Sequence, residues 1–282
     1  MEAWFFENQT GNFGIKIRIK KVLHHEYSSF QEITVYDTFE FGKMLVLDRA
    51  VMFTERNEFI YHEMLGLVPL FSHKNPETVL IIGGGDGGVV RECLKNPFVK
   101  HIDLVEIDKR VVDISKEFFP GISAGLDDKR VQVIRDDGIE FLKRVKDNDK
   151  YDVILIDSTD PVGPAEGLFK RDFYSSAERA LKCDGIFSAQ TESPFFNKDL
   201  IGDINKIIED IYGESSLYCA MIPVYPGGLW SFTIGSKKYR PQNIHKSYKG
   251  LDFASLDLKY YSPEIHTSSF ILPNFVKEIC KP

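Results

Sequence analysis

Apolar and polar residues alternate with two different periodicities along the chain. In the first part, isoleucines alternate with basic residues over 15–20, and short apolar or β-branched runs follow at 33–36, 44–47 and 50–53. Alternation with a period of two is typical of strands that bury one face, and turn residues between such runs favour hairpins. We therefore expect residues 1–56 to form a small antiparallel β-sheet domain.

A helical periodicity of apolar residues begins directly after these predicted strands. From Thr54 on, apolar residues between 59 and 67 recur at the spacing of one helix face. Proline interrupts helical hydrogen bonding, so the pattern predicts a helix that ends near Pro69.

After Pro76, apolar strands alternate with segments of helical spacing. The predicted strands are 78–82, 102–107, 131–134, 153–156 and 185–189, and the predicted helices are 89–94, 112–119, 139–145, 169–181 and 200–211. Two last strands, 217–222 and 230–234, have no helix between them and should pair as an antiparallel hairpin. Continuous apolar strands between helices are typical of a mainly parallel sheet covered on both faces. Residues 57–282 are therefore expected to form one α/β domain around a seven-stranded sheet.

The composition and the net charge of the chain limit the classes of protein and of binding partner that it can represent. The chain is 43% apolar and 27% charged, which excludes a collagen-like or disordered protein. Its net charge of −7, with no long basic run, makes it a poor general binder of nucleic acid. The acidity either keeps the protein soluble or reflects a cationic substrate.

The sequence also lacks signals for metal, disulfides or membranes. Its four cysteines are far apart and form no C-x-x-C pair, so neither a zinc site nor a disulfide framework is expected. No apolar run approaches the ~20 residues that span a bilayer, and the first ten residues do not resemble a secretory signal. We expect a cytoplasmic protein with no membrane partner and no bound metal.

In sheets of this kind the ligand lies at the carboxyl ends of the strands, near the point where strand order reverses. Four segments follow predicted strands and carry carboxylates: 83–88, 106–108, 137–138 and 157–160. These segments are the place to look for a functional site.

The glycine loop at 83–88 is the first of them. It contains G-x-G-x-x-G, which is a weak motif alone, but a strand precedes it, a helix follows it, and Glu106 ends the next strand. A carboxylate in that position typically accepts hydrogen bonds from ribose hydroxyls. A tight turn without a ligand is the simpler alternative, but five glycines in six positions carry a large entropic cost.

Asp86 indicates which nucleoside fits this loop. Dinucleotides place a pyrophosphate here, and the carboxylate of Asp86 would repel it. The same charge attracts a sulfonium nucleoside that carries an amine, and it disfavours a donor with its own carboxylate. This argues against a nicotinamide dehydrogenase and against an ordinary methyltransferase.

A second carboxylate pair, Asp157 and Asp160, follows the fourth predicted strand of the parallel series. Two close carboxylates can bind a metal, perform glycosidase-type acid–base chemistry, or bind an amine cation. Further metal ligands are absent nearby in the sequence and the fold context does not support a glycosidase, so amine binding is favoured. Helix capping by Asp160 or Thr159 is the structural alternative.

Several other residues can be interpreted either as part of a binding site or as purely structural. Asp137 with Gly138 either receives an adenine amino group beside a small residue or makes a surface turn. Tyr225 either closes a cation site or packs as a core aromatic. His62 belongs to half of a zinc-protease motif, which fails because the second histidine is missing. Tyr61 and His62 are adjacent on the predicted helix, so one or both reach the cleft.

Taken together, these residues resemble the spermidine synthase family of polyamine aminopropyltransferases. The matching segments run through nearly the whole chain: 27–33, 45–48, 54–64, 81–88, 105–108, 136–138, 156–166, 223–226 and 260–266. The resemblance implies an N-terminal β-domain and a Rossmann-like domain of the class I methyltransferase type.

The resemblance also implies roles for individual residues. The nucleoside part of decarboxylated S-adenosylmethionine is expected to contact Gln31, Glu106, Asp137, Gly138 and Pro164. Asp86 is expected to hold the aminopropyl amine, and Asp157 to accept a proton. The amine site is expected to comprise Tyr61, His62, Asp86, Asp157, the Ser158–Thr159 backbone, Asp160 and Tyr225. Met52 departs from a frequent family glutamine, which leaves the acceptor amine open.

The implied reaction is an in-line attack of a primary amine on the carbon bonded to sulfur, with methylthioadenosine leaving. The sulfonium compound is a co-substrate, so no resident cofactor is expected. Putrescine is the first choice of acceptor, with agmatine, cadaverine or a longer polyamine as alternatives. A non-catalytic polyamine-binding protein is the alternative of a different class. By the same resemblance, we expect a homodimer or a homotetramer.

Overall fold

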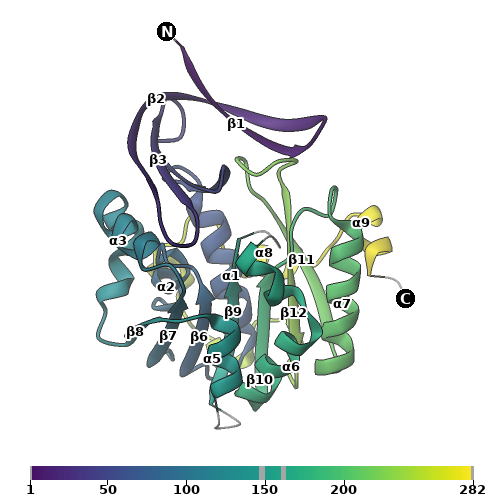
Figure 1. Cartoon of the computed structure of the whole chain (residues 1–282). Coiled ribbons are helices and arrows are strands. Elements are labelled where there is room, and N and C mark those ends of the chain that lie inside the picture. The colour runs from purple at the N-terminus through teal and green to yellow at the C-terminus, as the bar shows by residue number, and fades with distance from the viewer. Residues whose placement is uncertain (1, 146–149, 160–162, 281–282) are drawn as a thin grey trace.

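A computed structural model describes residues 2–145, 150–159 and 163–280 of the chain. Its strands form two sheets, one of five strands and one of seven. Figure 1 shows the five-stranded sheet at one end of the molecule, next to the larger α/β part. The two termini lie on different sides of the molecule.

The five-stranded sheet is antiparallel, with its strands in sequence order. Its strands are β1 (Ala3–Thr10), β2 (Phe13–Tyr27), β3 (Glu32–Thr38), β4 (Lys43–Leu47) and β5 (Ala50–Thr54). Four of them confirm the predicted runs. Strand β1 was missed because only Phe5 is buried there, while Trp4 and Phe6 are exposed, so apolar residues on both faces hide the alternation.

The seven-stranded sheet has the order β11-β12-β10-β9-β6-β7-β8. Its strands are β6 (Thr78–Gly83), β7 (His101–Glu106), β8 (Val131–Arg135), β9 (Tyr151–Asp157), β10 (Leu181–Gln190), β11 (Ser215–Met221) and β12 (Leu229–Ser236). Strands β6 to β10 are parallel, and β12 pairs antiparallel with both β10 and β11, which confirms the predicted terminal hairpin. This is the arrangement expected of a class I methyltransferase-type sheet.

Helices cover both faces of this sheet. The α-helices are α1 (Glu58–Ser72), α2 (Gly88–Cys93), α3 (Lys109–Phe118), α4 (Pro120–Ser123), α5 (Gly138–Arg144), α6 (Arg171–Ala180), α7 (Lys198–Tyr212), α8 (Pro263–Ser268) and α9 (Asn274–Ile279). Short 3-10 turns span Ala124–Asp127, Gly163–Phe169, Lys246–Tyr248 and Phe253–Leu256. Buried residues of α1 and α2 pack on one face, and those of α5, α6 and α7 pack on the other.

Helix α1 joins the two sheets. Nearly all of its residues are buried, and the core cluster around it includes Phe5 and Met44 from the five-stranded sheet and Val79 from the larger one. The prediction that this helix ends near Pro69 was wrong, because it continues to Ser72. Proline removes only one hydrogen bond near the end of a helix, and burial of the last turn outweighs that loss.

The point where strand order reverses lies between β6 and β9. Strand β6 pairs with β7 on one side and with β9 on the other, so the loops after these strands diverge and leave a crevice. In the described part of the chain, no helix is both long and apolar enough to cross a membrane. The boundary between residues 56 and 57 remains a prediction.

Candidate active site

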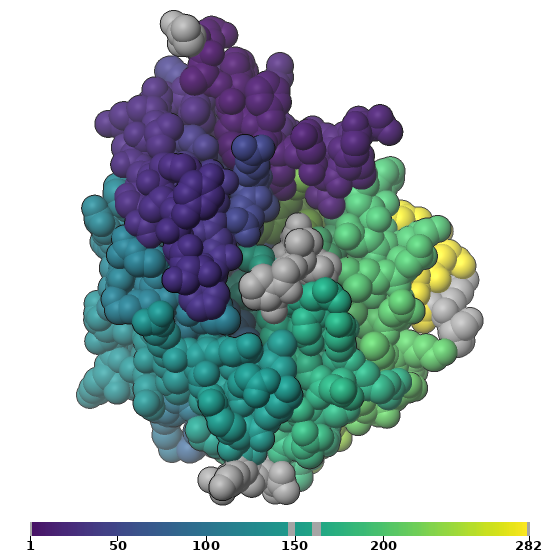
Figure 2. All heavy atoms as spheres, in the orientation of Figure 1, coloured from purple at the N-terminus to yellow at the C-terminus, as the bar shows by residue number. Residues whose placement is uncertain are grey.

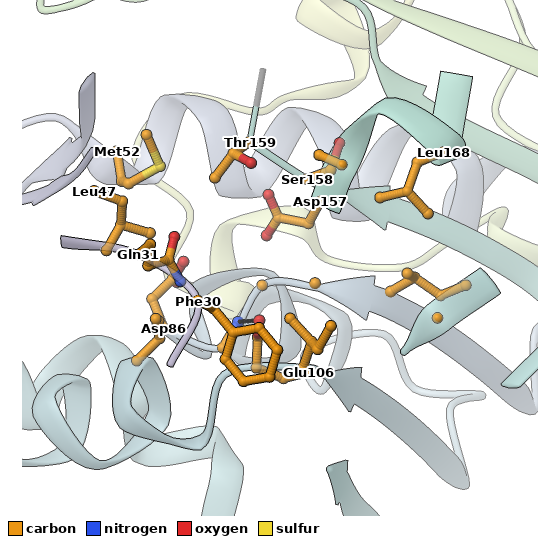
Figure 3. Close-up of a pocket in the computed structure, with 18 of the residues that line it drawn as sticks. Phe30, Gln31, Leu47, Met52, Asp86, Glu106, Asp157, Ser158, Thr159 and Leu168 are labelled. Carbon is orange, nitrogen blue, oxygen red and sulfur yellow. Dashed lines mark hydrogen bonds between the residues drawn. The ribbon is translucent and has the colours of Figure 1, made fainter. Parts of the chain in front are cut away.

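A pocket opens at this crevice, and residues of the five-stranded sheet and its turns form its roof. Figure 3 shows the pocket in close-up, and Figure 2 shows the N-terminal sheet against the larger domain. Its cavity volume of about 170 Å³ exceeds what a single water needs, so it can hold a larger ligand. The roof residues are Phe30, Gln31, Leu45, Leu47, Asp48 and Met52.

Nearly all of the predicted site residues line this pocket. They are Gln31, Tyr61, His62, Asp86, Glu106, Asp137, Gly138, Asp157, Ser158, Thr159 and Tyr225. Asp160 lies outside the described residues, as does the side chain of Pro164. Residues separated by almost 200 positions in the sequence therefore meet in one cavity.

Glu106 lies at the end of β7, where its carboxylate accepts backbone N–H groups from Gly85 at 3.1 Å and Asp108 at 2.8 Å. Burial raises the pKa of Glu106 to about 7, although these two hydrogen bonds oppose the shift. Each carboxylate oxygen has a second lone pair, so both can also accept a ribose hydroxyl. This position fits the expected ribose contact.

The glycine loop leaves space for two carboxylates. Gly83 and Gly84 have φ values of +79° and +69°, which glycine adopts at little cost. A Cβ on Gly84 would lie 2.6 Å from Asp157 Oδ2, and one on Gly85 would lie 2.8 Å from Glu106 Cγ. The glycines therefore allow the backbone to approach the acidic side chains of the neighbouring strands.

Asp137 and Gly138 start helix α5. Asp137 Oδ1 accepts the backbone N–H groups of Ile139 at 2.8 Å and Glu140 at 3.4 Å, which is an N-cap. A Cβ on Gly138 would lie 2.3 Å from Ile82 Cγ2, so the helix begins in close contact with β6. These residues have a structural role in addition to lining the pocket.

Gln31 is held by a residue to which we assigned no role from the sequence. Asp108 Oδ2 accepts hydrogen bonds from Gln31 Nε2 at 2.9 Å and from Ser28 Oγ at 2.6 Å. Asp108 also caps α3 by accepting the N–H of Arg110. The sequence places Asp108 two residues after Glu106, but it does not show that Asp108 binds Ser28 and Gln31, which are about 80 residues away.

Asp157 occupies the centre of the site at the end of β9. Its Oδ1 accepts the hydroxyl of Tyr61 at 2.8 Å, while its buried Oδ2 has no hydrogen-bond partner among the described residues. In Figure 3 the Asp157 carboxylate points into the open space, on the side opposite Gln31 and Leu47. Burial, followed by the negative charge of Asp86, raises the pKa of Asp157 to about 7.

Asp86 lies near Asp157 and contacts His62. Asp86 Oδ1 accepts the N–H of Gly88 at 2.7 Å and lies 3.3 Å from His62 Nε2. The other ring nitrogen of His62 lies 2.6 Å from Glu58 Oε2. Glu58 was not predicted as a site residue, although its spacing four residues before His62 places both on one helix face.

Tyr225 closes the other end of the pocket. Its hydroxyl donates to the backbone oxygen of Met52 at 2.7 Å, and its ring contacts Tyr61 edge to face. Beyond these residues, a second compartment is lined by Glu7, Gln9 and Trp230, among others. Met52 lines both compartments.

A cluster of His73, Asp152 and Asp184 lies outside this pocket. Metal-binding histidines normally donate the proton of their second ring nitrogen to an acceptor. Here His73 Nδ1 instead accepts the N–H of Asn75 at 3.1 Å, so Nε2 carries the proton. The ammonium of Lys182 already binds both oxygens of Asp152 at 2.9 Å, so this cluster does not fit a metal ion.

The fold and the pocket define a class of protein. A methyltransferase-type sheet with a buried carboxylate, Glu106, at the end of β7 is typical of a nucleoside-dependent transferase. The acidic groups beside it suit cationic ligands rather than phosphates.

Two family models match the chain. Residues 58–247 match the spermine/spermidine synthase domain, and residues 3–55 match the spermidine synthase tetramerisation domain. The chain belongs to the spermine/spermidine synthase family, and it is a transferase of the polyamine aminopropyltransferase class.

Individual relatives are similar over their whole length. The polyamine aminopropyltransferases of Bacillus cytotoxicus and Bacillus subtilis are each 50% identical, with coverage of 100% and 99% of both chains, respectively. A crystal structure of spermidine synthase in complex with the transition state analogue AdoDATO has a TM-score of 0.92 at 39% identity. Spermidine synthase from Thermotoga maritima has a TM-score of 0.91 at 38% identity. Each match covers 99% of this chain and 94% of the solved one.

Proposed function

We propose that this enzyme transfers the aminopropyl group of decarboxylated S-adenosylmethionine to putrescine, giving spermidine and methylthioadenosine. The observation that carries the proposal is Asp157 Oδ2, a buried carboxylate oxygen that lines the pocket without a hydrogen-bond partner among the described residues. Such an atom is costly to bury unless a ligand satisfies it. An amine supplies the missing donor.

The donor occupies the part of the pocket at the carboxyl ends of β6, β7 and β8. Glu106 accepts the ribose hydroxyls, while Gln31, Asp137, Gly138 and Pro164 surround the base and the ribose. Asp86 binds the donor's ammonium group. The bound AdoDATO of the solved relative supports a nucleoside site of this kind. The sulfonium compound is consumed as a co-substrate, and the reaction needs no resident cofactor.

The acceptor lies between Tyr61, His62, Tyr225 and the Ser158–Thr159 backbone. Asp157 orients the attacking amine, and Asp160 anchors the distal ammonium. The nitrogen lone pair forms the new C–N bond as the C–S bond breaks and sulfur takes its electron pair. A proton of the attacking amine passes to Asp157 as the C–N bond forms.

Asp157 is not strong enough to deprotonate a resting ammonium alone. The amine pKa of ~10.4 exceeds the ordinary Asp value by ~6.5 units, or ~9 kcal/mol. A pKa of about 7 for Asp157 narrows that gap, and the positive charge of the sulfonium lowers the pKa of the amine. Asp157 therefore accepts the proton as the bond forms.

A panel of acceptors tests the proposal. The enzyme is incubated with decarboxylated S-adenosylmethionine and putrescine, cadaverine, agmatine or spermidine, and products are identified by mass. Putrescine should react with the highest kcat/KM. Preference for another amine would replace the proposed acceptor but keep the reaction. Amine binding with no transfer would instead favour a non-catalytic binding protein.

We also propose that the enzyme assembles as a homotetramer. The match of residues 3–55 to a tetramerisation domain supports this assembly. Exposed aromatic side chains on the same segment supply apolar contact area, namely Trp4, Phe6, Phe13 and Phe39. Sedimentation equilibrium measures the mass, and a monomer at micromolar concentration would contradict the proposal.

A further inference from the structure

His62 lies between two carboxylates. Its Nδ1 is 2.6 Å from Glu58 Oε2, and its Nε2 is 3.3 Å from Asp86 Oδ1. The contact with Glu58 is a hydrogen bond, and the contact with Asp86 is at ion-pair distance. In a neutral imidazole that donates from Nδ1 to Glu58, the lone pair of Nε2 would lie beside the Asp86 carboxylate, whereas an imidazolium is attracted to both carboxylates. The geometry therefore points to a charged ring, even though the side chain is 98% buried.

We propose that Glu58 is a positioning residue: it accepts the Nδ1 proton of His62 and holds that ring as an imidazolium facing Asp86. The inference rests on the proposed function of the pocket, because it assigns a task to His62 within that site. Glu58 does not line the pocket itself, so it acts through His62.

Glu58 is well placed for this task. Arg91 Nη2 donates to Glu58 Oε2 at 2.7 Å, and Arg91 Nε donates to Glu92 at 2.7 Å. Burial opposes ionisation of Glu58, but the bonds from His62 and Arg91 outweigh it and lower the pKa to about 2. The carboxylate therefore stays charged and fixed.

The ring of His62 is also confined sterically. A Cβ on Gly88 would lie 2.2 Å from His62 Cε1, so the start of α2 packs directly against the imidazole. On another side, the Phe53 ring lies 6.0 Å away between centroids. The ring has little freedom to rotate away from its two carboxylates.

The charged and titratable groups around His62 come from several elements. Glu58 and Tyr61 belong to α1, Asp86 follows β6, Asp157 ends β9, and Arg91 with Glu92 lies on α2 behind Glu58. Burial alone would lower the pKa of His62. Asp86 and Glu58, with a smaller contribution from Asp157, outweigh burial and raise it to about 9.

A positive charge on His62 reduces the repulsion between the neighbouring carboxylates of Asp86 and Asp157. Asp86 raises the pKa of Asp157, and two close carboxylates tend to share a proton. The positive ring lowers the pKa of Asp157, which favours the ionised form of Asp157 next to Asp86. The same charge disfavours a protonated acceptor amine beside it, which favours the neutral nucleophile.

The first test measures His62 directly in the ligand-free protein. The Cε1–H signal is followed by NMR from pH 5.5 to 10 and assigned by its loss in His62→Gln. The wild-type ring should stay charged through neutral pH, and Glu58→Gln should lower its apparent pKa by at least about one unit. Glu92→Gln is the matched control, because Glu92 contacts Arg91 and Lys95 rather than the His62 ring and should shift the pKa of His62 much less than Glu58→Gln does.

Two NMR results would overturn the proposal: a wild-type ring that titrates at or below the ordinary histidine value, or one that Glu58→Gln does not shift. The wild-type titration keeps the test decisive even where the variant fails to fold. It also needs no turnover, so failure of the proposed reaction is distinguishable from failure of this inference.

The second test is a double-mutant cycle on aminopropyl transfer. Glu58→Gln should lower kcat/KM for putrescine about tenfold in the wild type but less than about twofold in a His62→Gln background. Equal losses in the two backgrounds would show that Glu58 does not act through His62.

Discussion

At the scale of single residues, the chemistry depends on where charge is buried. Asp86 lies in the loop after β6, whereas Glu106 and Asp157 are the last residues of β7 and β9. Burial raises the pKa of Glu106 and of Asp157 to about 7. The sequence predicted these carboxylates because each follows an apolar strand. It did not predict Glu58 or Asp108, because their importance comes from partners identified only once the chain is folded.

The first prediction concerns Asp157. Replacement by Asn removes the proton acceptor while retaining the shape of the side chain, so kcat should fall at least ~100-fold. The dissociation constant for methylthioadenosine should change less than about threefold. Rapid-quench kinetics and calorimetry measure the two quantities. Asp113→Asn, on the exposed side of α3, is the control, and near-normal turnover of Asp157→Asn would refute the proton-acceptor role.

The second prediction is a pH dependence. Below pH 7, the raised pKa values keep Asp157 and Glu106 largely protonated in the free enzyme, and neutral carboxyls attract cations weakly. Therefore kcat/KM for the acceptor should rise with pH through an inflection near 7. A stopped assay across this range measures it, with thermal unfolding at each pH as control. An inflection near ~4, the ordinary carboxyl value, would contradict it.

At the scale of elements, the helices and strands that bury many apolar residues were predicted from the sequence. The central strands β6 and β9 of the large sheet were predictable because they form nearly continuous buried apolar runs. Strand β1 was missed because it buries little, and the end of α1 was misplaced because tertiary packing outweighs the local effect of Pro69. Helices α8 and α9 were not identified, since each spans six residues and buries a single side chain, His266 and Val276, respectively.

The third prediction concerns the glycine loop. Gly84→Ala adds a Cβ at a φ of +69° and 2.6 Å from Asp157 Oδ2, so it should lower the free energy of unfolding by ~1–3 kcal/mol and reduce turnover. Denaturant unfolding and steady-state assays measure these effects. Gly250→Ala has a similarly positive φ of +91° with no atom within 4 Å, so it isolates the backbone strain.

Gly121→Ala serves as a second control, with neither a positive φ nor a close contact. Gly84→Ala should reduce turnover more than Gly250→Ala does. Equal effects on turnover would mean that contact with Asp157 is unimportant.

At the scale of the whole molecule, the pocket exists only because two sheets meet. The floor comes from the carboxyl ends of the parallel strands, and the roof comes from residues 30–52. Helix α1 contributes Tyr61 and His62 between them, and it shares one buried cluster with both sheets. The sequence predicted both sheets but not the close contact between them.

The fourth prediction follows from this shared pocket. Methylthioadenosine should slow hydrogen exchange both in the roof at 28–31 and in the loop at 83–88. At one hundred times its dissociation constant, it should stabilise the folded enzyme by ~2.7 kcal/mol. Mass spectrometry and thermal unfolding measure these effects, and NAD should produce neither. Protection confined to 83–88 would show that the roof does not contact the nucleoside.

The division between roof and floor has a consequence for how the family can diversify. Glu7, Gln9 and Met52, which border the second compartment, belong to the five-stranded sheet, whereas Asp86, Glu106 and Asp157 do not. Under the proposed function, substitutions at these three positions alter one wall of the second compartment and leave the carboxylates of the larger sheet in place. The opposite wall, which includes Tyr61 and Tyr225, belongs to the larger domain. A chimera that takes its first 56 residues from a relative would therefore vary one wall of this compartment against a constant set of carboxylates.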